Sequence, residues 1–165
     1  MLKKKVCMLG AFAVGKTSLV RRYVHSLFSE KYHTTVGVKV DKKTVACNDS
    51  TVDLILWDIH GEDDFQAVRA SYLRGASGCL LVVDGTRGYT LTVAHDLVTR
   101  CRKTIGNVPV IFVFNKSDLM DRWEISASQQ SALEGEGAVV VQTSAKDGSG
   151  VESAFTRLVE MMLME

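Results

Sequence analysis

Short apolar runs alternate along the chain with longer segments of helical periodicity. Aliphatic and β-branched residues of strand length occupy five runs, at Lys5–Leu9, Asp53–Trp57, Cys79–Val83, Val108–Phe114 and Ala138–Val141. Three of these runs are apolar throughout, as expected of strands that are covered on both faces of a parallel sheet. This alternation predicts an α/β fold.

The segments between the runs have the pattern of helices, at about Lys16–His25, Gln66–Arg74, Thr90–Ile105 and Ser126–Glu134. A last helix begins near residue 150. Its apolar residues recur at spacings that put them on one helical face: Val151, Ala154, Phe155, Leu158, Val159 and Met162. We expect that face to be buried.

One pair of strands departs from the alternation. The segments Val36–Ala46 and Thr51–Trp57 flank Cys47-Asn48-Asp49-Ser50, which is typical of a hairpin turn that adds one antiparallel strand. The sequence therefore predicts a doubly wound, six-stranded, mostly parallel sheet with one antiparallel strand and helices on both faces. Ligands of such sheets bind beyond the carboxyl ends of the strands.

Composition limits the classes of protein to which the chain can belong. Its 165 residues include 20 Lys and Arg and 19 Asp and Glu, so a net charge of +1 gives no electrostatic basis for nucleic-acid binding. No apolar run approaches the ~20 residues that cross a bilayer. Cys7, Cys47, Cys79 and Cys101 are far apart, which favours reduced core thiols over a zinc site or a redox dithiol. We expect one cytoplasmic domain, residues 1–165, that is monomeric and does not insert directly into a membrane.

A phosphate-binding loop follows the first predicted strand. The segment from Gly10 to Thr17 fits the pattern G-x-x-x-x-G-K-[ST] and opens a predicted helix, which is the context that a P-loop requires. Backbone N–H groups of such a loop converge on phosphate oxygens at the positive end of the helix. Lys16 would add a point charge to the β- and γ-phosphates, and the Thr17 hydroxyl would ligate Mg²⁺.

Two later motifs favour guanine as the base. Asn115-Lys116-Ser117-Asp118 ends one predicted strand, and Thr143-Ser144-Ala145-Lys146 follows the next. A carboxylate at Asp118 can accept hydrogen bonds from N1–H and from the exocyclic amine of guanine, whereas adenine has no matching pair of donors. The backbone N–H of Ala145 could reach guanine O6.

Taken together, these residues closely resemble the Ras-superfamily small GTPases, and the resemblance covers essentially the whole chain. Ser71-Tyr72-Leu73-Arg74-Gly75-Ala76 and Thr35-Val36-Gly37-Val38 are most similar to the Rab branch. The segment between Asp118 and Thr143 is too short for a Rho-type insert helix, and an Arf-like amphipathic N-terminal helix is missing. The resemblance implies a P-loop NTPase fold that binds GTP or GDP with Mg²⁺.

The resemblance also implies individual roles. Phe28 matches the aromatic residue that packs across guanine, and Tyr32 matches the one that closes over the phosphates. Thr35 matches the switch I threonine that ligates Mg²⁺ when the γ-phosphate is present. Asp58 and Gly61 match the start of switch II, where the Asp holds Mg²⁺ through water and the Gly N–H contacts the γ-phosphate.

Three sets of residues follow from this comparison. The expected Mg²⁺ ligands are Thr17, Thr35 and Asp58, and the expected catalytic residues are Lys16, Thr35, Gly61 and Glu62. The expected nucleotide-binding residues are Gly10, Phe12, Ala13, Val14, Gly15, Lys16, Thr17, Ser18, Phe28, Tyr32, Thr35, Asp58, Gly61, Asn115, Lys116, Asp118, Leu119, Ser144, Ala145 and Lys146.

The catalytic positions depart from the family pattern. Gln and then Glu usually follow the switch II Gly, but here the residues are Glu62 and Asp63. Compared with Gln, a Glu keeps the acceptor that orients water and loses the amide donor. Two outcomes are open: repulsion between the carboxylate and phosphate slows turnover, or a raised pKa lets Glu62 act as a base. His60 stands where the family usually has Ala, and either pairs with Glu62 or phosphate or faces solvent. Phe12 would crowd the route of an arginine finger from an activating protein.

Partner binding is expected through switches I and II, for effectors, exchange factors and activating proteins. Val40, Trp57 and Tyr72 match a cluster that Rab proteins place between the switches, and the cluster is either an exposed effector surface or buried against the sheet. The sequence ends at Glu165 without a Cys for prenylation, so either a lipidated tail lies outside it or the protein is soluble.

Two functions are compatible with these motifs. The first is a switch that cycles between GTP and GDP through Mg²⁺-dependent, slow hydrolysis. The second is a GTP-bound scaffold with negligible hydrolysis, which Phe12 and Glu62 favour. A P-loop kinase or ATPase is disfavoured by Asn115, Asp118 and the Ser144–Lys146 segment.

Overall fold

The computed structural model describes residues 2–29, 37–59 and 69–164 of the chain. Within them, six strands form one sheet in the order β2-β3-β1-β4-β5-β6. The strands are β1 (Leu2–Gly10), β2 (Val38–Cys47), β3 (Ser50–Ile59), β4 (Ala76–Asp84), β5 (Val110–Asn115) and β6 (Val139–Gln142). The helices are α1 (Lys16–His25), α2 (Ala70–Leu73), α3 (Tyr89–Ile105), the 3-10 helix η1 (Ser117–Arg122), α4 (Ala127–Gly135) and α5 (Val151–Leu163).

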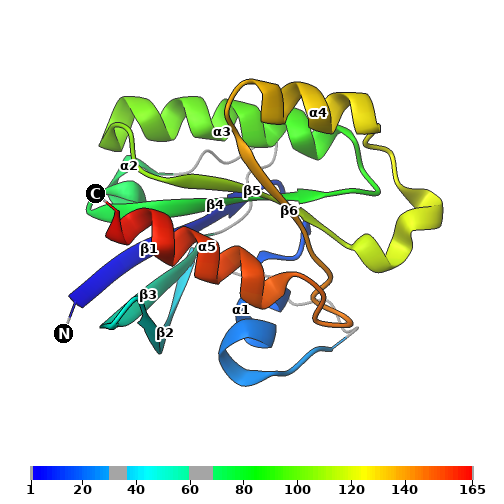
Figure 1. The fold of residues 1–165 in the computed structure, drawn as a ribbon. Coiled ribbons are helices and arrows are strands. Elements are labelled where there is room, and N and C mark those ends of the chain that lie inside the picture. The colour runs from blue at the N-terminus through cyan, green and yellow to red at the C-terminus, as the bar shows by residue number, and fades with distance from the viewer. Residues whose placement is uncertain (1, 30–36, 60–68, 165) are drawn as a thin grey trace.

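The expected sheet topology is confirmed. Strand β2 pairs antiparallel with β3, and all other neighbours are parallel. Asn48 and Asp49 form the hairpin turn with φ of 48° and 64°, the left-handed conformation that a two-residue turn between twisted strands requires. Helices α3 and α4 cover one face of the sheet, and α1 and α5 cover the other (Figure 1).

Several element boundaries differ from the prediction; β1 and β4, for example, begin at Leu2 and Ala76 and not at Lys5 and Cys79. Strand β5 begins at Val110 and not at Val108, because Pro109 has no N–H for the ladder. Helix α2 begins at Ala70, since Arg69 has extended backbone, and residues 66–68 of the predicted helix lie outside the described residues. Helix η1 was not predicted, because its short 3-10 turn lacks the periodicity of an α-helix.

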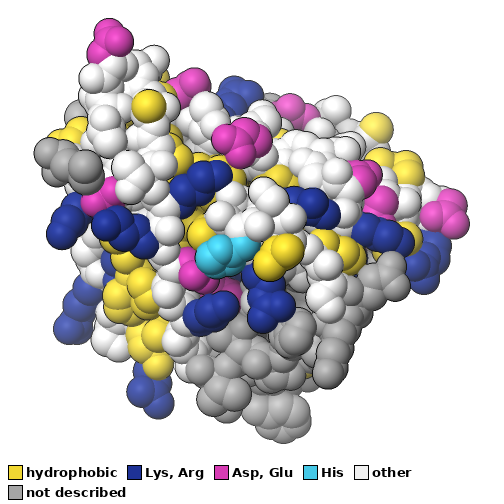
Figure 2. Space-filling model, turned by 90° about the horizontal axis from the view of Figure 1, so that it is seen from below, with side chains coloured by type: hydrophobic (Ala, Val, Ile, Leu, Met, Phe, Trp, Pro, Cys, Tyr) yellow, Lys and Arg dark blue, Asp and Glu magenta, His cyan; other side chains and the backbone are white. Residues whose placement is uncertain are grey.

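Two apolar cores lie on opposite faces of the sheet. On the α1 and α5 side, the rings of Tyr23 and Phe155 are stacked with centroids 3.9 Å apart, and the predicted apolar face of α5 is buried. The core beneath α3 includes Leu97 and three cysteines. Figure 2 shows basic and acidic side chains interspersed on the face of the molecule that is seen from below.

The part of the chain that the structure describes contains no helix that combines the length and the apolar character needed to cross a membrane. The longest described helix, α3, has 17 residues and includes Arg100, Arg102 and Lys103.

Candidate nucleotide site

The loop between β1 and α1 has the backbone conformation that a phosphate cradle needs. Gly10, Ala13 and Gly15 have positive φ values of 152°, 61° and 106°. A Cβ at Gly10 would lie 2.4 Å from the carbonyl oxygen of Val82, and one at Gly15 would lie 2.3 Å from Nδ2 of Asn115. Both glycines are therefore required by close approach as well as by backbone conformation.

Helix α1 begins directly after this loop and ends at the residues that the sequence predicted. Its N-cap, Gly15, has no side chain to bond the first N–H groups, and no acidic residue occupies the first turn. The positive end of the helix and its backbone donors therefore face the loop, as an anion site requires. Ser18 lies in this first turn and is half-buried.

Lys16 is the buried charge of this loop. Its side chain is 6% exposed, and its Nζ donates to the carbonyl oxygens of Gly10 and Ala11 at 3.2 Å each. Burial lowers the pKa of Lys16 to about 8, the negative charge of Asp58 opposes this shift and Arg87 adds to it. A cation that is held at the cost of desolvation is suited to a phosphate, which would supply negative charge at short range.

Thr17 and Asp58 bring two oxygen ligands together from α1 and β3. The Thr17 hydroxyl donates to Oδ2 of Asp58 at 2.5 Å, and Asp58 is 1% exposed. Mg²⁺ prefers hard oxygen ligands and is usually held by a few protein groups together with phosphate and water. The residues present therefore fit a magnesium ion beside the loop.

Asn115 joins the phosphate loop to the segment after β6. Its Nδ2 donates to the carbonyl oxygen of Val14 at 3.0 Å. Its Oδ1 accepts from the Thr143 hydroxyl at 3.0 Å and from the backbone N–H of Ala145 at 3.3 Å. The side chain is 2% exposed, so these bonds form in a buried environment where leaving them unmade is costly.

Asp118 lies beside the same segment but faces solvent. Its Oδ1 accepts from the Ser144 hydroxyl at 2.8 Å, and the residue is exposed. This bond uses one carboxylate oxygen and fixes the orientation of the other. An exposed carboxylate held in one orientation is suited to recognise a pair of donors on a planar base. Leu119, the next residue, is half-buried.

Lys116 has a structural role that the motif alone did not predict. Its Nζ donates to the carbonyl oxygen of Ala13 at 3.2 Å and lies 2.9 Å from Oδ2 of Asp84. Burial alone would raise the pKa of Asp84, but hydrogen bonds from Lys116, Thr86 and Arg87 outweigh it and lower that pKa. Asp84 thus holds Lys116 against the loop.

Arg87 makes a second connection to the loop. Its Nε lies 2.9 Å from Oδ2 of Asp84, and its Nη2 donates to the carbonyl oxygen of Phe12 at 2.8 Å. The Phe12 side chain is 38% exposed. Sequence reasoning missed Asp84 and Arg87 because they belong to none of the motifs. The one available signal was the position of Asp84 at the carboxyl end of a buried strand.

Arg22 of α1 supports the segment after β6. Its Nε donates to the carbonyl oxygen of Ala145 at 2.7 Å, and its Nη2 donates to that of Lys146. Sequence reasoning missed Arg22, because it resembles any other cation on the polar face of α1. The expected base-binding residues Ser144, Ala145 and Lys146 are therefore positioned from α1 as well as from β5.

The remaining expected residues are Phe28 and a group outside the described residues. Phe28 is half-buried and packs on the core beneath α1 and α5. Tyr32, Thr35, Gly61 and Glu62 lie outside the described residues, as do His60 and Asp63.

The comparisons with known proteins agree with this geometry. The model of the Ras family matches residues 5–164. The chain is 34% identical to GTP-binding protein Rab-3D of Rattus norvegicus over 160 residues, which are 96% of this chain and 73% of that protein. It is 35% identical to Ras-related protein RABA5a of Arabidopsis thaliana over 158 residues, 94% of this chain and 72% of that protein. Ras-related protein Rab-3C of Bos taurus is 34% identical over 160 residues, 96% of this chain and 70% of that protein.

Proposed function

Because this chain belongs to the Ras family and is a Rab-like GTP-binding protein, we propose that it cycles between GTP and GDP through slow, Mg²⁺-dependent hydrolysis. In this proposal residues 1–165 act as one nucleotide-binding domain, and the bound nucleotide controls which proteins the switch segments contact. The γ-phosphate orders both switches when GTP is bound, and hydrolysis releases them.

The bonds of Asn115 carry the proposal. One side chain contacts Val14 in the phosphate loop and Ala145 in the segment expected to bind guanine. A nucleotide needs its phosphates and its base recognised at a fixed separation, and a shared buried side chain supplies that constraint. Asp118, held by Ser144, would accept hydrogen bonds from N1–H and the exocyclic amine of guanine.

The phosphate end would bind through backbone donors, the Lys16 ammonium and a metal ion. Thr17, Asp58 and Thr35 would hold Mg²⁺, whose charge neutralises phosphate oxygens when it is bound. Lys16 exchanges its bonds to Gly10 and Ala11 for bonds to phosphate oxygens, so its charge gains partners without new exposure to water.

Glu62 sets the expected rate of hydrolysis. A carboxylate at this position accepts a hydrogen bond from the attacking water but repels phosphate oxygens. We therefore expect slower turnover than with a Gln. The second candidate, a scaffold that stays bound to GTP, is favoured by the same residue and by Phe12, whose exposed side chain extends from the phosphate loop.

Partner binding would use the surface around Val40, Trp57 and Tyr72. Val40 pairs with Trp57 across the hairpin and is 49% exposed, while Trp57 and Tyr72 are half-buried with ring centroids 6.5 Å apart. Lys5 lies over the Trp57 ring at 3.6 Å. This mixture of aliphatic, aromatic and cationic groups is suited to an effector interface, in which the bound partner would bury one aromatic side chain as an anchor.

The nucleotide that copurifies with the protein tests this function. Denaturation followed by chromatography is expected to release GDP from a cycling switch. Stoichiometric GTP would support the scaffold, and adenine nucleotides would refute the guanine assignment. Removal of Mg²⁺ with a chelator is expected to speed nucleotide release, because the metal holds phosphate oxygens to Thr17 and Asp58.

Single-turnover hydrolysis of bound GTP tests the catalytic assignment. Glu62→Gln is expected to raise the rate of GTP hydrolysis clearly, because the amide restores a donor and removes the repulsion from phosphate oxygens. The neighbouring Asp63→Asn, which removes an equal charge, is the control. An unchanged rate in Glu62→Gln would remove this residue from the mechanism. Phe12→Gly is expected to change the rate more with an activating protein present than without one.

A further inference from the structure

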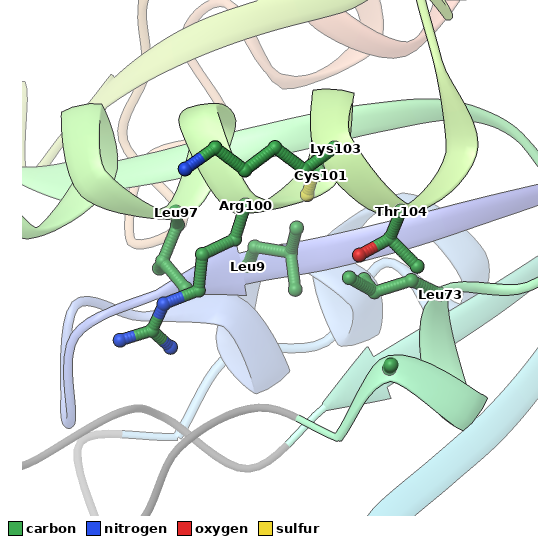
Figure 3. Close-up of a pocket in the computed structure, with 8 residues that line it drawn as sticks. Leu9, Leu73, Leu97, Arg100, Cys101, Lys103 and Thr104 are labelled. Carbon is green, nitrogen blue, oxygen red and sulfur yellow. The ribbon is translucent and has the colours of Figure 1, made fainter.

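A cavity of about 220 Å³ lies between α2, α3 and the end of β1, next to a cluster of cysteines. Four aliphatic residues and one thiol contribute to its wall together with three polar side chains of α3: Leu9, Ala70, Leu73, Leu97, Cys101, Arg100, Lys103 and Thr104. In Figure 3 the Cys101 sulfur points from α3 toward Leu9, with Leu97 on one side and Thr104 on the other. The cavity therefore gives a small molecule a mainly apolar path to a thiol that is itself 1% exposed.

Two further thiols lie behind Cys101. Cys7 and Cys79 are register partners on β1 and β4, both are 0% exposed, and all three cysteines belong to the core beneath α3. The Cys79 thiol interacts electrostatically with those of Cys101 and Cys7. The Cys7 thiol donates to the carbonyl oxygen of Tyr72 at 3.5 Å. These cysteines are far apart in the chain, so their spacing did not predict a dithiol, and the fold brings them together in one core.

The contacts of the two thiols give them different reactivity. The neighbouring Cys79 thiol lowers the pKa of Cys101 despite its burial, and the charges of Arg100 and Arg102 act in the same direction. The neighbouring thiols of Cys101 and Cys7, together with burial, raise the pKa of Cys79. In such an arrangement the thiol with more thiolate character, beside the cavity, is oxidised first, and the second thiol then condenses with the product.

We propose that Cys101 is an oxidation site for a small hydroperoxide that enters this cavity, and that Cys79 captures the product as a disulfide. The Cys101 sulfur attacks the peroxide, so an S–O bond forms and the O–O bond breaks. The thiol proton leaves with the departing alcohol or water, and sulfur is oxidised while the peroxide is reduced. The Cys79 sulfur then attacks the sulfenic acid: the S–S bond forms, the S–O bond breaks, and the hydroxyl leaves as water with the Cys79 proton.

Two probes of this class are hydrogen peroxide and tert-butyl hydroperoxide. The second has an apolar group that the aliphatic wall can accept, and both are small compared with the cavity. Cys47 is the internal control, because it is half-buried in the hairpin and packs on the opposite core. A reaction governed by exposure alone would modify Cys47 first.

The experiment treats the folded, nucleotide-loaded protein with each probe and maps the products by peptide mass spectrometry. The expected product is a Cys79–Cys101 disulfide, which lowers the mass by two hydrogen atoms and is reversed by dithiothreitol. In Cys79→Ala the sulfenic acid at Cys101 is expected to persist and to react with dimedone. Oxidation of Cys47 ahead of Cys101, or of Cys101 only in urea, would overturn the site. A lasting Cys101 sulfenic acid in the unmodified chain would overturn the role of Cys79.

A matched pair of variants tests the cavity without touching a cysteine. Thr104 and Thr99 are both exposed on α3, but Thr104 lines the cavity and Thr99 does not. Thr104→Phe is expected to slow oxidation of Cys101 about tenfold by filling the path, and Thr99→Phe is expected to leave the rate unchanged. Equal rates in both variants would show that the oxidant reaches Cys101 by another route and would overturn the proposal.

Discussion

The two ends of the proposed nucleotide site are held by different forces. At the base end, the buried side chains of Asn115 and Thr143 and the backbone of Ala145 bond one another through neutral groups. At the phosphate end, Lys16 and Asp58 are buried as charges. Neutral hydrogen bonds satisfy a buried site at any pH, whereas a buried cation remains costly until negative charge lies beside it.

This difference assigns separate tasks to the two ends. The base end can keep its shape through bonds within the protein, so we expect its residues to provide selectivity. The phosphate end would gain most from phosphate and metal, so we expect its residues to provide an affinity for nucleotide that depends on pH and salt. The Asn115 side chain contacts both ends directly, through Val14 at the phosphate loop and Ala145 at the base end.

Removing that contact is expected to give the largest effect. Asn115→Ala removes the acceptor of Thr143 and Ala145 and the donor to Val14, all of them buried groups. We expect GDP to dissociate about 100-fold faster and the free energy of unfolding to fall by about 3 kcal/mol. Fluorescence of a labelled GDP measures the first, and urea denaturation the second.

The control for Asn115 is Asn107→Ala in the loop after α3, where the residue is exposed. That variant is expected to match the unmodified chain in both measurements. If Asn115→Ala destabilised the fold but left GDP dissociation unchanged, Asn115 would support the loops without linking the two ends of the site.

The motif residues could be predicted because local sequence determines them. Gly15 ends the loop and starts α1, so the helix boundaries were right, and Asn48 and Asp49 predicted the hairpin turn. The supporting residues could not be predicted in this way. Arg22 lies 123 positions from Ala145, and Arg87 lies 75 positions from Phe12. Such contacts depend on how strands are ordered in the sheet, and no local pattern encodes them.

The second largest effect is expected at the base end, where a charge supports neutral groups. Arg22→Ala removes charge-assisted hydrogen bonds to the carbonyl oxygens of Ala145 and Lys146. We expect GDP dissociation to become about tenfold faster, because each lost bond loosens the segment that contacts the base. The neighbouring Arg21→Ala, which removes an equal charge from α1 and neither of these bonds, is the control. Equal rates for the two variants would mean that only the net charge of α1 matters.

The phosphate end is expected to respond to pH through Lys16. Its pKa is about 8, and phosphate oxygens beside it favour the charged form, so GDP binding above pH 8 takes up a proton. The affinity for GDP is therefore constant well below pH 8 and falls above it, by roughly fivefold between pH 7 and pH 8.7. Titration calorimetry in buffers of different ionisation enthalpy measures both the affinity and the proton uptake.

A base-end variant sharpens this test. Asp118→Asn exchanges one acceptor oxygen for a donor and is expected to lower the affinity for GDP by a similar factor at every pH. Its pH profile should run parallel to that of the unmodified chain. A flat profile in the unmodified chain, or proton release in place of uptake, would contradict the role of the Lys16 charge.

The smallest effect is expected at Arg87, because its task is shared. Both Arg87 and Lys116 pair with Asp84, and each donates to the phosphate loop, at Phe12 and Ala13 respectively. Arg87→Ala leaves the Lys116 contact in place, so we expect GDP dissociation to become only about threefold faster. Asp84→Asn weakens both pairs, so we expect GDP to dissociate faster from this variant than from Arg87→Ala in the same assay. If GDP instead dissociated equally fast from Arg87→Ala and Asp84→Asn, Arg87 alone would connect β4 to the phosphate loop. The phosphate end would then depend on one supporting residue, as the base end depends on Arg22.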